Sequence, residues 1–255
     1  MCTLIVLDRM VPDFPVVAAA NRDEFYGRPA SGPQRLLDVP WIVGPRDEQA
    51  GGTWIGVGEG RLFAGLTNRP AGADRDPNRR SRGEVTLQAL RGGTVEAVLA
   101  DLGTLPSDRY NGFNLFCSGL DGACVVSYGL DGFVRRLSPA LHIVTNRGVN
   151  LSAEPKVARI RELIGDPGAI STVERAIEIL TRVLADHSGD ELVNRVCIHS
   201  ELYGSRASSL IALHETDPSR SIYQYTEGPS CKAPWKDVSE LLWSARGWHV
   251  AGGSG

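Results

Sequence analysis

The feature that most constrains this chain is an apolar strand that starts at its second residue, a cysteine. Residues 2–7 read CTLIVL, a continuous run rich in β-branched side chains, and after a turn at residues 11–15 the run VVAAA follows. Two such runs joined by a short turn are typical of a β-hairpin. The second run ends in the polar tetrad Asn21-Arg22-Asp23-Glu24. We therefore expect Cys2 and this tetrad to lie at the same edge of a sheet.

The rest of the chain divides into short strand-like and helical segments. Strand-like runs occupy residues 54–57, 62–66, 114–117, 124–128, 133–137, 141–145, 193–198, 208–214 and 222–225. Helical periodicity occupies residues 84–102, with a break at Gly92-Gly93, and residues 154–164 and 172–185. Residues 69–82 are rich in Pro, Gly, Asp and Arg, which indicates an exposed loop. This order predicts an α+β fold in which helices cover packed antiparallel sheets.

Length and charge narrow the class of protein. The chain has 255 residues, 42% of them hydrophobic, which favours a single domain over residues 1–255 with residues 251–255 as a disordered tail. A formal net charge of −3 gives no electrostatic reason to expect nucleic acid or an anionic membrane as partner. No run approaches the roughly 20 apolar residues that span a bilayer, and no basic region precedes the first apolar run. We expect no transmembrane segment and no signal peptide.

The cysteines argue against two kinds of stabilising site. The five of them, Cys2, Cys117, Cys124, Cys197 and Cys231, are odd in number, scattered, and form no CxxC pair. This pattern disfavours both a disulfide framework and a structural zinc site. It predicts free thiols, no metal, and a cytoplasmic protein.

Cys2 is the strongest candidate for a nucleophile. Methionine aminopeptidase removes Met1 readily before a small residue, which would give Cys2 both a thiol and a free α-amine. An α-amine has a pKa of about 7.7–8.0 and can take the thiol proton without a histidine. We expect a nearby ammonium and guanidinium to lower the thiol pKa, whereas the other thiols on apolar strands stay inert. The alternative is an ordinary buried cysteine at the start of an edge strand.

Polar side chains at other strand ends supply candidates for the remaining roles. Asp23 could hold an ammonium, and Arg22 could steady a thiolate or a substrate carboxylate, unless the tetrad is a solvated turn. Two Thr-Asn-Arg tripeptides close apolar strands and offer Asn68 and Asn146 as oxyanion donors. Arg206, in YGSR, precedes a further strand. Turn asparagines and a surface arginine are the simpler alternatives.

Two further motifs have ordinary explanations. In VCIHSE, alternation would place Cys197 and His199 on one face of a strand, where a hydrogen-bonded core histidine is the simpler interpretation. The sequence GGTW suits a turn followed by the packed aromatic Trp54. The chain contains no GxGxxG, Walker, HExxH or GxSxG motif.

Eight motifs between the N-terminus and about residue 213 form a set that can be compared with known families. They are MCTLIV, AAANRDEFYGRPA, GPRDEQAGGTWIGV, LFAGLTNRP, SRGE, YNGFNL, HIVTNRG and YGSRASSLI. This set is similar to the NRDE family, the group that includes the transport and Golgi organisation proteins. That family more distantly resembles the choloylglycine-hydrolase and penicillin V acylase branch of the N-terminal-nucleophile hydrolases. The resemblance implies a four-layer αββα fold with two packed antiparallel sheets.

The resemblance also implies residue roles. Cys2 matches the nucleophile and Asp23 the carboxylate that fixes the α-amine. Asn68 matches an oxyanion-hole asparagine, and Asn146 a second active-site asparagine. Arg206 takes the place of a late active-site arginine. The residues expected to bind substrate are Arg22, Asn21 and Trp54. If these roles hold, the five catalytic candidates converge on one pocket.

Two functions follow as hypotheses. The first is a hydrolase or acyltransferase that uses Cys2 on the amide or thioester of a small acyl compound and needs no cofactor. The second is a non-catalytic carrier for haem, an acyl-CoA or another lipid, using the same pocket. The polar constellation around Cys2 favours the enzyme, while the oligomeric state is left open.

Overall fold

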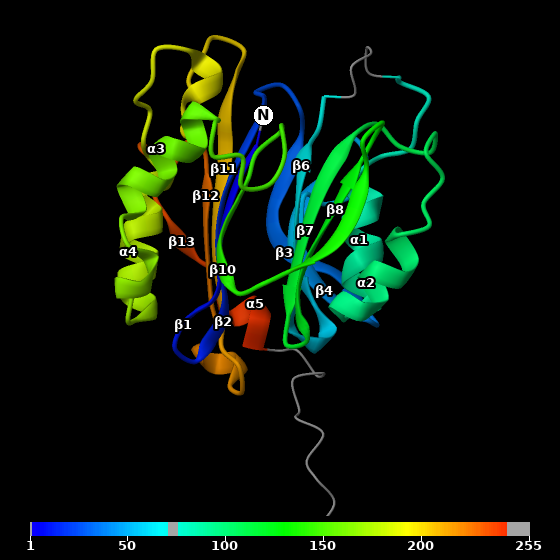
Figure 1. The fold of residues 1–255 in the computed structure, drawn as a ribbon, viewed down its shortest axis with the longest axis horizontal. Coiled ribbons are helices and arrows are strands. Elements are labelled where there is room, and N and C mark those ends of the chain that lie inside the picture. Colours follow the sequence, from blue (N-terminus) through cyan, green and yellow to red (C-terminus); the bar gives the residue numbers. More distant parts are fainter. Residues whose placement is uncertain (1, 71–75, 244–255) are drawn as a thin grey trace, which may run out of the picture.

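Two antiparallel sheets face each other between helices in the computed structural model, which describes residues 2–70 and 76–243 (Figure 1). The strands of the first sheet are β1 (Thr3–Val11), β2 (Phe14–Phe25), β10 (Ala140–Val144), β11 (Tyr203–Leu213), β12 (Ile222–Glu227) and β13 (Lys236–Asp237). The second sheet is built from β3 (Ala30–Asp38), β4 (Trp41–Asp47), β5 (Ile55–Gly58), β6 (Leu62–Asn68), β7 (Phe113–Gly119), β8 (Gly122–Tyr128) and β9 (Phe133–Leu137). Within the described ranges the sheet orders are β10-β1-β2-β11-β12-β13 and β3-β4-β5-β6-β7-β8-β9.

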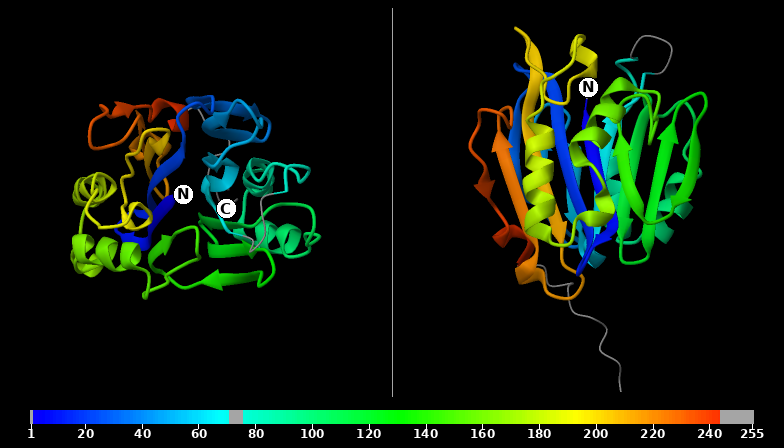
Figure 2. Two further views of the ribbon diagram at one scale, coloured as in Figure 1. Left: turned by 90° about the horizontal axis from the view of Figure 1, so that it is seen from above. Right: turned by 60° about the vertical axis from the view of Figure 1, so that its left-hand side comes forward.

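Helices form the two outer layers. The outer face of the second sheet carries α1 (Gly83–Gly92) and α2 (Val95–Leu102), while α3 (Pro155–Ile164) and α4 (Val173–Leu184) cover the first sheet (Figure 2). A short helix α5 (Glu240–Trp243) and 3₁₀ turns at Glu59–Arg61, Pro167–Ala169, Leu192–Asn194 and Pro218–Arg220 complete the described elements. In the described part of the chain, no helix is long and apolar enough to cross a bilayer.

The strand β1 is buried on both faces, which explains its continuous apolar sequence. Leu4 and Val6 point into the core between the sheets, whereas Ile5 and Leu7 pack towards α3 and α4. Alternate residues of a strand face opposite sides, so a central strand between two packed layers has no polar face. A third core lies between the second sheet and α1 and α2.

The observed architecture confirms the expected α+β fold and the four αββα layers. The break at Gly92-Gly93 is confirmed as well, because α1 ends there with Gly93 in the left-handed conformation. The strand expected over residues 193–198 is wrong: a 3₁₀ turn and an irregular segment replace it. The sequence analysis did not predict β3 and β4. β3 lacks a clear strand pattern because it is partly exposed and contains polar residues and a proline. The tail at residues 251–255 lies outside the described residues.

Candidate active site

The site begins where the first hairpin opens at the upper edge of the sheets. The register of β1 and β2 pairs Thr3 with Asn21, so Cys2 lies opposite Arg22. The backbone N–H of Cys2 donates to Asn146 Oδ1 at 3.0 Å. The side-chain amide of Asn146 in turn donates to the backbone carbonyl of Asn68. These bonds join the ends of β1 and β6 to the segment that follows β10.

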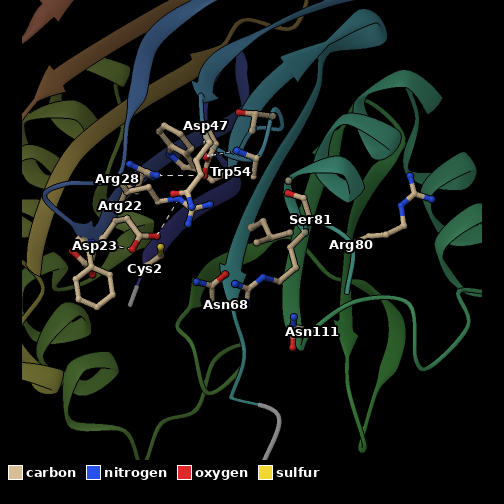
Figure 3. A pocket seen from close by; sticks show the side chains of 18 of the residues that line it. Cys2, Arg22, Asp23, Arg28, Asp47, Trp54, Asn68, Arg80, Ser81 and Asn111 are labelled. Carbon is tan, nitrogen blue, oxygen red and sulfur yellow. Dashed lines mark hydrogen bonds and ion pairs between the residues drawn. The ribbon is translucent and has the colours of Figure 1, made fainter. Parts of the chain in front are cut away.

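A cavity of about 540 Å³ opens beside Cys2 (Figure 3). It is lined by Cys2, Arg22, Asp23, Glu24, Phe25, Arg28, Asp47, Gln49, Ala50, Thr53, Trp54, Leu66, Asn68, Arg79, Arg80, Ser81, Arg82, Gly83, Asn111 and Tyr203. Among these described residues, arginines outnumber carboxylates by five to three. Arg80 pairs with Glu84 and points away from Cys2 in Figure 3, which leaves the other arginines to set the positive charge of the cavity.

Arg22 is held tightly in one wall of this cavity. Its guanidinium carbon lies 4.2 Å from the ring centroid of Trp54, and its Nη2 lies 3.6 Å from Asp47 Oδ2. Arg28 Nε donates to the same carboxylate oxygen at 2.8 Å. Arg22 is 5% exposed, and its Nη1 makes no hydrogen bond within the described residues. Burial lowers the Arg22 pKa, while nearby Cys2 and Asp47 favour its charged form.

Asp23 lies on the other side of Cys2 and is almost fully buried. Its Oδ1 accepts a hydrogen bond from Ser205 Oγ at 2.6 Å, and its backbone carbonyl accepts one from the Tyr203 hydroxyl at 2.7 Å. Burial raises the Asp23 pKa to about 6, against the opposing effects of Lys156, the N-terminal ammonium and the Ser205 hydrogen bond. This carboxylate is well placed to interact with an amine on Cys2.

Lys156, at the start of α3, is a site residue that the sequence did not reveal. It is 2% exposed, and its Nζ donates to Thr3 Oγ1 at 3.4 Å. Burial lowers its pKa, and Asp23 is the strongest of the anions that oppose this. A lysine in an amphipathic helix usually points to solvent, so nothing local in the sequence marks this one as buried.

With Met1 in place, the pKa of the Cys2 thiol is raised rather than lowered, and the low pKa expected once Cys2 is the first residue stays a prediction. Burial raises this pKa above its ordinary value and outweighs the lowering by the N-terminal ammonium; Asp23 adds to the increase. A backbone hydrogen bond from Asp23 and the charge of Arg22 lower it only in part. The resting thiol is therefore protonated, and its activation requires a base next to it.

The outer wall of the cavity depends on two glycines from separate motifs. A Cβ on Gly52 would lie 2.5 Å from the backbone carbonyl carbon of Gly83. A side chain at this position would therefore push the two backbone segments apart. The Thr53 N–H donates to the Gly83 carbonyl across this contact, at 3.4 Å. The contact places the start of α1 and the preceding residues 79–82 over Cys2. Residues 79–82, the last part of the segment expected to be an exposed loop, thus line the cavity.

Two of the sequence candidates lie elsewhere, which corrects their expected placement. Asn21 faces the helix layer, where its side-chain amide donates to the carbonyls of Leu184 and Val196, both at 2.9 Å. Arg206 does not line the cavity but donates to the backbone carbonyl of Tyr26. It occupies a bulge between β11 and β2, where the register shifts after Ser205, and such a bulge redirects a side chain. The other candidates, Cys2, Arg22, Asp23, Trp54 and Asn68, converge on the cavity, with Asn146 bonded behind Cys2.

The cavity offers little to a bound metal or haem. Among the described lining residues none is a histidine, and Cys2 and Tyr203 are the available ligands of the kind that bind haem iron. The lining is instead rich in charged hydrogen-bonding groups. It suits a polar or anionic small molecule.

Solved structures share this arrangement of layers. A variant of the conjugated bile acid hydrolase from Clostridium perfringens aligns with a TM-score of 0.59, 14% identity, and coverage of 94% of this chain and 93% of that chain. Penicillin V acylase from Agrobacterium tumefaciens aligns with a TM-score of 0.55, 14% identity, and coverage of 97% and 89%. These similarities show that the chain has the fold of the N-terminal-nucleophile hydrolases.

The sequence comparisons identify the family. The model of the family described as Transport and Golgi organisation 2 matches residues 1–226, so the chain belongs to that family. The mouse Transport and Golgi organization 2 homolog is 31% identical over 127 residues, which cover 47% of this chain and 45% of the mouse protein. The human homolog is 32% identical over 132 residues, with the same coverage. The match thus spans less than half the length of these relatives.

Proposed function

We propose that the protein is an N-terminal-cysteine hydrolase or acyltransferase acting on an amide or thioester of a small acyl compound. The observation that carries the proposal is the hydrogen bond from the Cys2 nitrogen to Asn146 at the edge of a charged cavity. Once Met1 is removed, this nitrogen is an α-amine fixed beside its own thiol. Nucleophile and base then belong to one residue.

The proposed reaction begins with transfer of the thiol proton to the α-amine. The thiolate sulfur forms a bond to the substrate carbonyl carbon, and the carbonyl oxygen becomes an oxyanion. The ammonium then gives its proton to the leaving nitrogen or sulfur as that bond breaks, which leaves an acyl group on Cys2. Water, or another acceptor, releases the acyl group by the same steps in reverse order. The mechanism requires no cofactor.

Asn146 and Asn68 have different roles in this mechanism. Both polar atoms of the Asn146 side chain are engaged, with the Cys2 nitrogen and the Asn68 carbonyl, so Asn146 orients the amine. Within the described residues no hydrogen bond engages the Asn68 side chain, which lies beside Cys2 in Figure 3. Its amide is the better candidate for the oxyanion donor. Asp23 stabilises the ammonium form of the amine.

The charge of the cavity supports a substrate that carries an anionic group. Arg22 presents a buried, unsatisfied Nη1, and Arg28, Arg79 and Arg82 line the same space. Arginine binds carboxylates and phosphates through paired N–H groups. We place the scissile carbonyl at Cys2 and the anionic group towards these arginines.

A direct test is capture of an acyl-enzyme. Purified protein is incubated with a panel of anionic acyl amides and acyl thioesters, and turnover and intact mass are measured. We expect an N-terminus at Cys2, hydrolysis of at least one compound, and an acyl adduct on Cys2 that Cys2→Ala abolishes. Cys2→Ser is the matched variant, because it keeps an N-terminal hydroxyl nucleophile. Active protein that retains Met1 would remove the α-amine from the mechanism.

The carrier hypothesis is tested in the same experiment. Haem and an acyl-CoA are titrated into the wild type and into Cys2→Ala, and binding is followed by absorbance and by calorimetry. Tight binding of either ligand without any turnover across the panel would favour a carrier over an enzyme. The charged cavity lining, with no histidine among its described residues, supports the enzyme.

A further inference from the structure

A second cluster of reactive side chains lies outside the cavity. Cys197 Sγ is 3.7 Å from Cys231 Sγ and 3.5 Å from His199 Nε2. His199 Nε2 is 3.1 Å from Cys231 Sγ. His187 completes the group: the ligand atoms of His187, His199 and Cys231 all lie within 4.8 Å of one another. Cys197 thus contacts two members of this group of three but is not itself within 4.8 Å of every ligand atom in it.

These separations fit the edges of a tetrahedral zinc site. Zn–S bonds of about 2.3 Å and Zn–N bonds of about 2.0–2.1 Å imply sulfur–sulfur edges of about 3.8 Å and sulfur–nitrogen edges of about 3.5–3.6 Å. The observed distances of 3.7 Å and 3.5 Å at Cys197 match both edges. The Cys231–His199 distance of 3.1 Å is a few tenths of an ångström short, a difference that a small rotation of either side chain removes.

The chain around the four residues holds them in place. His187 Nδ1 lies 3.1 Å from the Ala185 carbonyl; a hydrogen bond there fixes the tautomer and leaves the Nε2 lone pair for a metal. The Cys197 N–H donates to the Asp186 carbonyl at 2.8 Å, which ties the segment carrying Cys197 to the end of α4. Cys231 lies in a turn in which Lys232 N–H donates to the Pro229 carbonyl.

We propose that Cys197, His199, Cys231 and His187 bind one Zn²⁺ ion. Two Sγ–Zn bonds and two N–Zn bonds form, and the two thiol protons leave to solvent, so the occupied site has no net charge. Soft sulfur with imidazole is the donor set that zinc prefers in closed, four-coordinate sites.

Such a site would brace the wall behind Asp23. Ile198, between two of the ligands, donates its N–H to Ser205 Oγ at 2.9 Å and accepts from the Ser205 N–H at 2.8 Å. Ser205 is the residue that donates to Asp23. The ion would fasten three segments that are distant in sequence: the end of α4, residues 197–199, and the turn after β12. This proposal differs from the expectation of no metal, which rests on the scattered cysteines and the missing CxxC pair.

The test is a metal measurement on the full chain, independent of any enzymatic activity. The protein is purified under reducing conditions, its zinc content is measured by mass spectrometry, and Co²⁺ is then titrated into the metal-stripped form. We expect about one Zn²⁺ per chain and a Co²⁺ spectrum with thiolate charge-transfer and intense tetrahedral bands. Cys231→Ser and His199→Gln lose both signals, whereas Cys124→Ala, a buried cysteine on β8, keeps them.

A second variant guards against misfolding. His187 is exposed, so His187→Asn should fold normally and weaken Zn²⁺ binding at least about tenfold in competition with a chromophoric chelator. Reduced wild-type protein that binds no stoichiometric metal, or His187→Asn and Cys231→Ser variants with unchanged affinity, would overturn the proposal. So would a Cys197–Cys231 disulfide in metal-free protein purified without reductant, which would make the pair a redox site instead.

Discussion

The thiol at Cys2 and the thiols at Cys197 and Cys231 lie in two regions that meet at Ser205, yet their neighbours differ in kind. Around Cys2 the neighbours include the charged side chains of Asp23 and Arg22. Around Cys197 they are a second sulfur and an imidazole, and burial together with the Cys231 sulfur raises the Cys197 pKa to about 12. Ser205 influences both, through Asp23 and through Cys197.

The neighbouring polar groups, rather than burial, therefore distinguish the proposed nucleophile Cys2 from the proposed metal ligands Cys197 and Cys231. Burial raises the pKa in both regions. A protonated thiol with a base and an adjoining cavity can attack a substrate carbonyl, whereas a protonated thiol among soft ligands can exchange its proton for a metal. Four predictions test or sharpen this comparison.

The largest effect is expected from Cys2→Ala. Loss of the proposed nucleophile should lower kcat/KM by more than about 10⁴-fold, since the other proposed groups act only through it. Cys124→Ala, which removes a thiol outside both regions, should leave the rate close to that of the wild type. The measurement is steady-state hydrolysis of the best substrate from the screen. Turnover that survives in Cys2→Ala would place the chemistry elsewhere.

Asn68→Ala should have the next largest effect. Removing one oxyanion donor typically lowers kcat by about 10²–10³-fold, with little change in the stability of the protein. Thermal unfolding, measured beside the kinetics, separates loss of the donor from loss of the fold. An unchanged kcat would assign the oxyanion to other groups, among which Arg22 is the first candidate.

The pH dependence should report on Asp23. Its carboxylate stabilises the ammonium only when ionised, so kcat/KM should fall more steeply below a pH of about 6 than protonation of the α-amine alone would produce. The free energy of unfolding should change in the opposite sense, because the pKa of Asp23 in the folded protein is above its ordinary value of 3.8. The contribution of protonated Asp23 to stability is complete at pH below about 4 and is lost as the pH rises through 6. Asp23→Asn should remove both effects. A rate that is flat from pH 5 to pH 7 would contradict this assignment.

The smallest effect is expected from Arg206→Ala. This side chain bonds to the Tyr26 carbonyl outside the cavity, so kcat/KM should change by about twofold or less, equivalent to about 0.5 kcal/mol. Arg22→Ala, by contrast, removes the unsatisfied donor from the cavity and should raise KM about tenfold or more. Equal losses in the two variants would restore Arg206 to the site.

Local features of the sequence were enough for much of the site. The hairpin needs only a turn and two apolar runs, and its register brings Cys2 opposite Arg22. The period of two along β2 already separates Asn21 and Asp23 from Arg22, because Ala19 packs towards the helices and Ala20 towards the other sheet. Alternation alone does not exclude Asn21, because Asp23 lies on the same face of β2 and still lines the cavity.

Tertiary structure alone decided the rest. The side chain of Arg206 is directed by a bulge that the sequence of the strand does not predict. Lys156 is buried because α3 packs over Thr3. Residues 79–82 become a cavity wall only because Gly52 and Gly83 let two backbones touch. Cys231 meets Cys197 across 34 residues of chain. Sequence patterns report periodicity and local propensity, whereas the pKa of a thiol and the partners of a ligand depend on contacts between distant segments, which exist only once the layers have packed.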